Sequence, residues 1–173
     1  MARRETYATT GPGIGVRFFG GWHYPADLCD SPDLVARGYA DGVPMGGQME
    51  ARPSGSGGPP TFLISALKDP GSASRPGTDL QLIQVVKGWL DKDGKTNEKV
   101  YDVAWSGDRK PGTDGRGPAG GNTVDGVNAT WTNTTESAEL GVAFPWPTAC
   151  SSCCAASTGN RSAEAVKATE RSG

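Results

Sequence analysis

The sequence predicts a mostly β domain, an antiparallel β-sandwich with long Gly/Pro-rich loops. Its 26 Gly and 13 Pro residues lie between short apolar runs rather than in one tract, which is typical of many turns joining short strands. Two β-type runs also flank a Gly-containing turn, as in a hairpin. The length of 173 residues suits one domain and can bury a hydrophobic core.

The N-terminal third supplies one strand and much loop. Residues 1–12 are expected to be the end of a helix that runs into a turn. A strand follows and is ended by Gly20 and Gly21. Residues 22–60 look loop-like, apart from a short apolar patch at 34–35. The strand places three alternating apolar residues on one face: Ile14, Val16 and Phe18.

The centre of the chain supplies the expected core. Residues 61–67 carry apolar side chains on both faces, as in a central strand covered on both sides. Residues 80–105 form two β-type runs around the turn at 91–94, and this hairpin is expected to form the centre of the core. Trp89 and Trp105 flank the hairpin, so we expect both to be buried.

The C-terminal part has weaker signals. Residues 106–126 form a Gly/Asp/Pro loop, and a short strand is expected across 127–132. From residue 141 on, large apolar residues become rare. The tail 141–173 is therefore expected to be disordered, with at most a marginal helix over 161–171, and to contribute little to the fold.

Charge excludes some partners. With 17 basic and 19 acidic residues the net charge is -2, so no strong field draws the chain to nucleic acid or an anionic membrane. No stretch approaches the roughly 18 apolar residues of a membrane helix, and no apolar core follows the first positive charges as in a signal peptide. The localisation is not determined by these features.

Candidate catalytic or metal-binding residues are few. His23 is the single histidine, with Asp27, Asp30 and Asp33 nearby, but a loop establishes no catalytic geometry, and a surface or structural role is favoured. Asp91 and Asp93 hint at a calcium loop without its usual spacing. Cys150, Cys153 and Cys154 could hold half a zinc site, and the only other Cys or His residues that could complete it are His23 and Cys29. The cysteines are distributed too unevenly along the chain for a usual disulfide framework, so they do not determine the redox compartment.

Tryptophans provide the main binding alternative. Exposed aromatic side chains on a β-sandwich can stack on sugar rings, whereas buried ones dominate β cores. Core packing is the default prediction, and a stand-alone carbohydrate- or ligand-binding module is the alternative. The five positions are Trp22, Trp89, Trp105, Trp131 and Trp146.

Six segments together resemble the C-terminal part of a bacterial family, domain-of-unknown-function family 3604. They are RRETYATTGP at 3–12, VRFFGGW at 16–22, GVPMGG at 42–47, ALKDPG at 66–71, QVVKGW at 84–89 and VYDVA at 100–104. The resemblance covers about residues 1–140. It implies a longer parent whose N-terminal part is similar to PHP-type metal-dependent phosphoesterases, in which clustered His, Asp and Glu bind divalent metals.

None of those clusters maps onto this sequence, so no catalytic, cofactor or metal residue is transferred. The family usually continues past residue 141 with an aromatic strand, whereas here a Ser/Cys/Ala tail follows. We therefore expect a fragment in which Met1 is internal or a miscalled start and the end is frameshifted or truncated. A truncated sheet would expose strand edges that favour self-association.

The resulting expectation has three parts: 1–12 as the exit from a missing PHP-like domain, 13–140 as the β-rich domain, and 141–173 as a divergent tail. The expected role is that of an accessory, structural β-domain of a PHP-like hydrolase. Such a domain would not be catalytic on its own and would pack against its PHP-like partner.

Overall fold

The computed structural model describes residues 3–25, 27–54, 58–107, 116–117, 122–132 and 137–146, and three later strands. These later strands are β11 (Cys154–Ala156), β12 (Gly159–Arg161) and β13 (Val166–Thr169). The described chain is mostly antiparallel β-structure, as predicted. No helix among the described residues is long and apolar enough to cross a membrane.

One layer is a four-stranded antiparallel sheet in the order β10-β3-β1-β2. Its strands are β1 (Gly15–Gly21), β2 (Val43–Pro44), β3 (Thr61–Leu67) and β10 (Glu139–Pro145). β3 pairs with β1 on one side and β10 on the other. Ile64 and Leu63 point to opposite faces of β3, and both are fully buried. The prediction of a central strand covered on both sides is confirmed.

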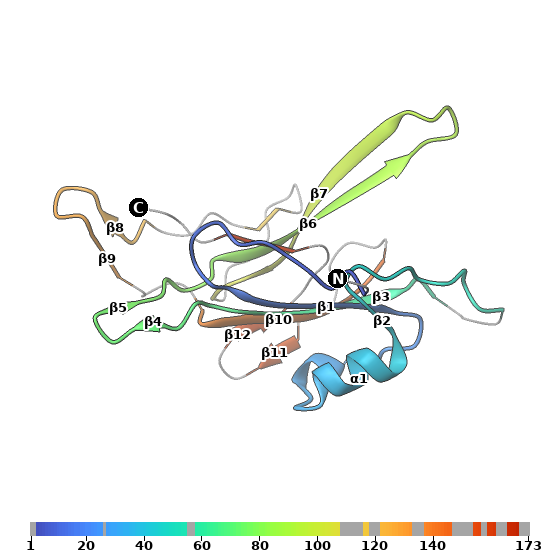
Figure 1. Cartoon of the computed structure of the whole chain (residues 1–173), viewed down its shortest axis with the longest axis horizontal. Helices are drawn as coiled ribbons and strands as arrows, with labels where there is room; N and C mark the ends of the chain where they lie inside the picture. Colours follow the sequence, from blue (N-terminus) through green and yellow to red (C-terminus); the bar gives the residue numbers. More distant parts are fainter. Residues whose placement is uncertain are drawn as a thin grey trace.

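The second layer is a three-stranded sheet in the order β13-β6-β7, formed with β6 (Leu82–Leu90) and β7 (Thr96–Trp105). Figure 1 shows the bases of β6 and β7 lying over the four-stranded sheet. The main core fills the space between the layers, which confirms the sandwich-like prediction. It consists of Ile14, Val16, Ile64, Ala66, Leu80, Ile83, Val85, Val103, Ala104, Leu140, Val142 and Phe144.

A short helical segment covers the other face of the four-stranded sheet. It comprises the 3-10 helix η1 (Leu28–Asp30) and α1 (Leu34–Asp41). Gly38 lets the ring of Phe19 approach the helix, because an added Cβ would lie 2.6 Å from Phe19 Cδ2. The helical segment and the four-stranded sheet together enclose a second cluster of Phe19, Tyr24, Leu28, Cys29, Leu34, Leu63 and Ala143.

The prediction that residues 22–60 form only loop was therefore wrong. Leu34 is the one large buried side chain of α1, since the other helix residue facing the sheet is Gly38. A helix of eight residues with only two contact positions is short enough to be taken for part of the surrounding loop. The predicted N-terminal helix was also wrong, because the described residues 3–12 contain no helix and lead directly into β1.

Small hairpins occupy the remaining described connections. β4 (Gly71–Ser72) pairs with β5 (Arg75–Pro76) at the turn predicted after Asp69. β8 (Val124–Asp125) pairs with β9 (Thr130–Trp131); β9 lies where a short strand was expected, whereas β8 lies in the predicted loop 106–126. β11 and β12 pair with each other. No residue of the β4–β5 or β8–β9 hairpin belongs to the two core clusters.

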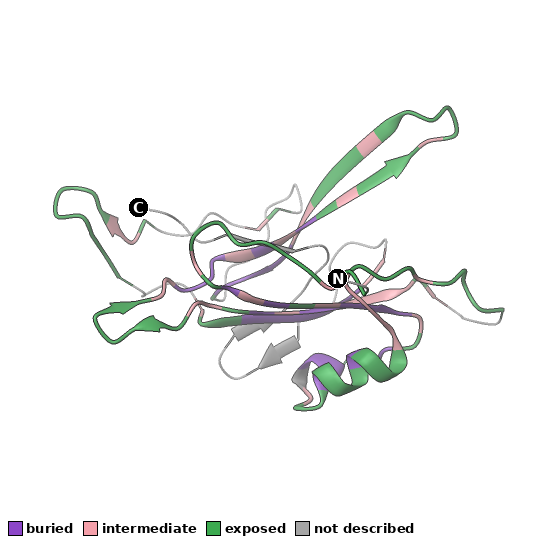
Figure 2. Ribbon diagram, viewed as in Figure 1, coloured by how far each residue is buried: buried purple, intermediate pink, exposed green. Residues whose placement is uncertain are grey.

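The central hairpin divides into a buried base and a projecting arm, residues 86–100. Figure 2 shows burial at the base of β6 and β7 giving way to exposure along the arm. Val85 is buried and Trp105 is only 3% exposed, whereas Trp89 is 40% exposed. The prediction that both tryptophans lie in the core was right for Trp105 and wrong for Trp89. The two strands simply extend beyond the sheet that covers their base.

The boundary predicted at residues 140–141 was also wrong. β10 runs on to Pro145, and its residues Leu140 to Phe144 are buried. Residues 141–144 have the sequence Gly-Val-Ala-Phe, and each of them pairs with a residue of β3. Within the predicted marginal helix 161–171, the described residues form strands, and β13 pairs with β6. Other tail residues lie outside the described residues.

Candidate functional site

The residues proposed around the histidine do not assemble into a site. His23, Asp27 and Asp33 are all exposed. The side chain of Asp30 lies outside the described residues. In the part of the chain that the structure describes, no group of three or more His, Cys, Asp or Glu side chains is placed to hold a metal ion.

Asp91 has a structural role in the turn where calcium was considered. Its Oδ1 atom accepts the backbone N–H groups of Asp93 and Lys95, both at 2.9 Å, and its Oδ2 accepts the Asn97 side-chain amide at 3.3 Å. These donors, chiefly the Lys95 N–H, lower the pKa of the Asp91 carboxyl. Gly94 takes the left-handed conformation with φ of 77° that closes the turn. The carboxylate thus caps the hairpin.

Cys29 departs from the expectation for a zinc ligand. Its side chain is fully buried in the cluster beneath α1, and the residue is disulfide-bonded. A sulfur in a disulfide is not the thiolate that zinc binds. Cys29 therefore takes part in a disulfide that the uneven cysteine spacing did not predict. Cys150 and Cys153 lie outside the described residues.

The best-formed candidate site lies on one face of the arm. In the β6–β7 ladder, Val85 pairs with Tyr101, Lys87 with Lys99, and Trp89 with Asn97. Because side chains alternate along a strand, these six lie on the same face. Val85 is buried at the base, and the others form what we call the cationic face: Lys87, Trp89, Asn97, Lys99 and Tyr101.

Aromatic rings line the base of the cationic face. The half-buried Trp146 follows β10 and packs edge-on against Tyr101, with ring centroids 5.7 Å apart. It also contacts Phe62, at 6.0 Å, and its backbone N–H donates to the Pro60 carbonyl. Such edge-to-face contacts hold the rings in fixed orientations. Trp146 therefore presents a rigid ring at the root of the arm.

Both lysines of the cationic face lie over rings. Lys87 Nζ is 4.0 Å from the ring centroid of Trp146 and 5.1 Å from that of Trp89. Lys99 Nζ is 4.9 Å from the ring of Tyr101. Among the described residues neither ammonium forms an ion pair with a carboxylate. Two like charges directly opposite each other repel across the strands, so the rings supply the compensating attraction.

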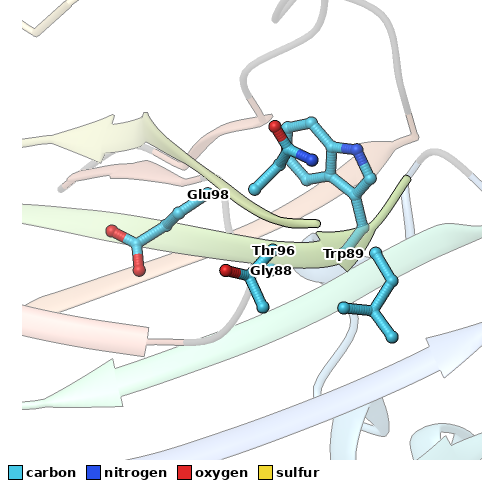
Figure 3. A pocket seen from close by; sticks show the side chains of 6 residues that line it. Gly88, Trp89, Thr96 and Glu98 are labelled. Atoms are coloured by element: carbon cyan, nitrogen blue, oxygen red, sulfur yellow. The ribbon is translucent and has the colours of Figure 1, made fainter. Parts of the chain in front are cut away.

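The tip of the arm borders an open hollow of ≈ 630 Å³, lined by Gly88, Trp89, Leu90, Thr96, Asn97 and Glu98. In Figure 3 the Trp89 indole rises on one side of the hairpin, while Thr96 lies on the other. The hollow therefore lies around the tip of the arm, with the Trp89 indole and the Asn97 amide on one side of the hairpin and Leu90, Thr96 and Glu98 on the other. An exposed indole beside an amide suits a ligand with both a flat apolar face and a polar substituent.

The opposite face of the arm carries exposed aliphatic side chains beside Thr96 and Glu98. Val86 pairs with Val100, Leu90 pairs with Thr96, and Gly88 leaves a gap between them. Leu90 is 66% exposed and Val100 is 45% exposed. We call Val86, Leu90 and Val100 the apolar face. Exposed aliphatic side chains that pair across strands mark contact surfaces more often than isolated ones do.

The remaining tryptophans differ in their surroundings. Trp22 is half-buried and donates from Nε1 to the Glu50 carbonyl at 3.3 Å. Trp131 is exposed on β9, away from the arm. The row of exposed tryptophans that a sugar-binding module would display is thus limited, among the described residues, to separate positions on two hairpins.

Sequence reasoning did not single out Lys87 or Lys99, and it named Trp146 only as one of five tryptophans. A signal for the first two was present, since Lys-x-Trp in β6 and Lys-x-Tyr in β7 put a lysine and an aromatic residue on one strand face. Their register across the hairpin and the approach of Trp146 depend on the folded structure.

Comparison with known proteins gives one result. A family model described as "Protein of unknown function (DUF3604)" matches residues 1–148. No curated protein and no solved structure matches the chain. The match covers most of the chain and extends past residue 140, over all of β10 and Trp146. The chain therefore belongs to the DUF3604 family.

Proposed function

We propose that this chain is an accessory β-domain that packs against a PHP-like metal-dependent hydrolase domain and is not catalytic on its own. The observation that supports this role best is the arm, whose apolar face is exposed although the base of the same hairpin is a core element. Exposed Val86, Leu90 and Val100 offer an apolar contact that a neighbouring domain would cover.

The geometry of the arm supports docking rather than catalysis. A paired two-stranded ribbon stabilised by a capped turn presents its side chains in a fixed register. Preformed surfaces lose less conformational entropy on binding than flexible loops do. An arm of this kind could shape the entrance to a neighbouring active site without contributing a reacting group.

The test is binding to a separately produced PHP-like domain from a family member. We expect a complex on size-exclusion chromatography and by calorimetry. The Val86→Ser/Val100→Ser double variant should weaken it by about tenfold or more, because interface aliphatic contacts are lost. Val127→Ser is the matched control, since Val127 is 93% exposed and lies off the arm.

Two outcomes would contradict the accessory role. One is the absence of any complex; the other is equal weakening by the arm variant and by Val127→Ser. Turnover of a generic phosphodiester by the chain alone with added manganese, abolished by a chelator, would show that it is an enzyme. Elution of the chain alone as a dimer would indicate self-association through strand edges instead.

A ligand-binding module is the second candidate, and the hollow beside Trp89 favours it. Trp89 is exposed beside the Asn97 amide, and Thr96 and Glu98 line the other side of the hollow. Binding of a soluble oligosaccharide by the chain in isolation, with loss on Trp89→Ala, would support this role. It does not exclude docking through the apolar face, which lies on the other side of the hairpin.

A further inference from the structure

We propose that the cationic face binds an anionic sugar, with a ring stacked on Trp89 and its carboxylate or sulfate group held by Lys87 and Lys99. This inference does not depend on the accessory role. It names a ligand class for the second candidate, the ligand-binding module, and rests on the geometry of that one face.

The first argument is charge. Lys87 and Lys99 are directly opposite each other in the ladder, and neither has a carboxylate partner among the described residues. An anion placed between them would replace a repulsion with two attractive contacts. The pair is thus complementary to a negative group rather than to a neutral one.

The second argument is the absence of competing acids on this face. Glu98 lies between Asn97 and Lys99 in sequence, so strand alternation directs it to the opposite face. Asp91 is already engaged by N–H donors in the turn. Asp102 bonds the side-chain amide of Gln84, its partner across the strands. These three acidic side chains of the hairpin therefore leave the lysine pair accessible to an external anion.

The third argument is the spacing of the ring and the charges. Trp89 and Asn97 form the pair two residues further along the ladder from Lys87 and Lys99. Two residues of a strand span about 7 Å, which is close to the reach of a sugar ring and its charged substituent. A ring stacked on the Trp89 indole would hence place that substituent near the ammonium groups, with the Asn97 amide available to a hydroxyl.

An acidic protein segment would satisfy the lysines equally well, but it does not explain the exposed indole beside the hollow. Stacking on the indole needs a flat face. A sugar ring offers such a face, together with hydroxyl groups that the Asn97 amide can bond. The observations therefore favour the sugar, and the peptide becomes an outcome of the test.

The experiment measures binding of the full chain by calorimetry at low and moderate salt. The probes are trigalacturonic acid, a sulfated disaccharide, neutral cellotriose and a short poly-glutamate peptide. We expect binding of one or both anionic sugars, weakening as salt rises, and no binding of cellotriose. Preference between the first two probes distinguishes a carboxylate from a sulfate as the group recognised.

Variants test the residues. Lys99→Gln, at an exposed position, should weaken binding by about tenfold, the usual effect of removing one charged hydrogen bond. Trp89→Ala should weaken sugar binding to a similar extent. Lys92→Gln in the turn removes the same charge off the cationic face and should leave affinity unchanged. Lys87→Gln is secondary, because Lys87 also packs on Trp146.

The proposal is overturned if neither anionic sugar binds, or if cellotriose binds equally well. It is also overturned if poly-glutamate binds as tightly as the sugars and Trp89→Ala has no effect, since the face would then recognise charge alone. Equal weakening by Lys92→Gln and Lys99→Gln would show a diffuse electrostatic effect. The outcome is independent of whether the chain binds a PHP-like domain.

Discussion

Tyr24 fixes the helical segment to the four-stranded sheet. Its hydroxyl donates to the Gly38 carbonyl at 2.7 Å. The ring fits between Gly21 and Gly42, where an added Cβ would lie 2.7 Å and 1.9 Å from Tyr24 atoms. Burial, with a smaller effect of the Asp41 charge, raises the pKa of Tyr24 to about 12. A single phenol thus connects β1, α1 and the turn into β2.

Tyr24→Phe should lower the free energy of unfolding by about 1 kcal/mol at pH 7, because one buried hydrogen bond is lost. The neutral phenol stabilises the fold fully below its unfolded pKa near 10. That stability is lost as pH rises toward about 12, because the unfolded state releases its proton first. Denaturant midpoints between pH 7 and 12 should therefore fall more steeply for wild type than for Tyr24→Phe. Parallel curves would contradict this assignment.

Asp69 ties the N-terminal segment to the turn after β3. Its Oδ2 accepts the Gly13 N–H at 2.5 Å, and its Oδ1 accepts the Gly71 N–H at 2.8 Å. These two donors, Gly13 first, lower the pKa of the Asp69 carboxyl below its ordinary value of 3.8. The lowered pKa means that the ionised form stabilises the fold, and that this contribution is lost as pH falls through the folded pKa.

Asp69→Asn should therefore melt at a lower temperature than wild type at pH 7, since an amide cannot accept both N–H groups in this arrangement. The difference should shrink as pH falls from 3.8 through the lower folded pKa, because the unfolded state takes up a proton first. Melting temperatures of both proteins from pH 7 to 2.5 test this. A difference that stays constant over the range would rule out the carboxylate as its source.

At the scale of the element, the hairpin shows how a strand register assigns opposite roles to neighbouring side chains. Val85 is buried in the main core, whereas Val86 belongs to the exposed apolar face. A shift of one residue would exchange the two. The irregularity in pairing between Ile83 and Gln84 lies just before this position and helps fix the register of the arm.

Val85→Asp should therefore cost several kcal/mol, because it buries a charge without a partner, and could exceed the stability of the domain. Lys92→Ala in the turn should cost less than about 0.5 kcal/mol, as exposed changes usually do. Soluble yield and denaturant midpoints compare the two. Similar behaviour would mean that Val85 faces solvent and that the register is wrong.

At the scale of the whole molecule, the two layers depend on β10, which comes late in the chain. β10 pairs with β3 over seven positions and contributes Leu140, Val142 and Phe144 to the main core. Trp146, just beyond it, joins the aromatic contacts at the base of the arm. The sandwich is therefore complete only when residues 141–146 are present.

A chain ending at Gly141 should lose most of its stability, since it lacks Val142, Phe144 and Trp146. Deleting large buried side chains costs about 2–5 kcal/mol each. A chain ending at Trp146 keeps β10 and should melt well above the shorter one. Melting temperatures of both chains and the full chain test this. Equal melting of the two truncated chains would show that β10 is dispensable.

The sequence by itself determined the β class, the central strand 61–67 and the hairpin with its turn, because these depend on local alternation of apolar residues and on turn residues. It also determined the family, because several family segments occur in it in the same order. Tertiary structure decided the rest. α1 is only eight residues long and buries just Leu34 and Gly38, and β10 opens a stretch with few large apolar residues, so both are recognised only from the sheet strands that they contact. The exposure of Trp89 and the pairing of Lys87 with Lys99 depend on where the covering sheet ends and on cross-strand register, which are properties of the assembled layers.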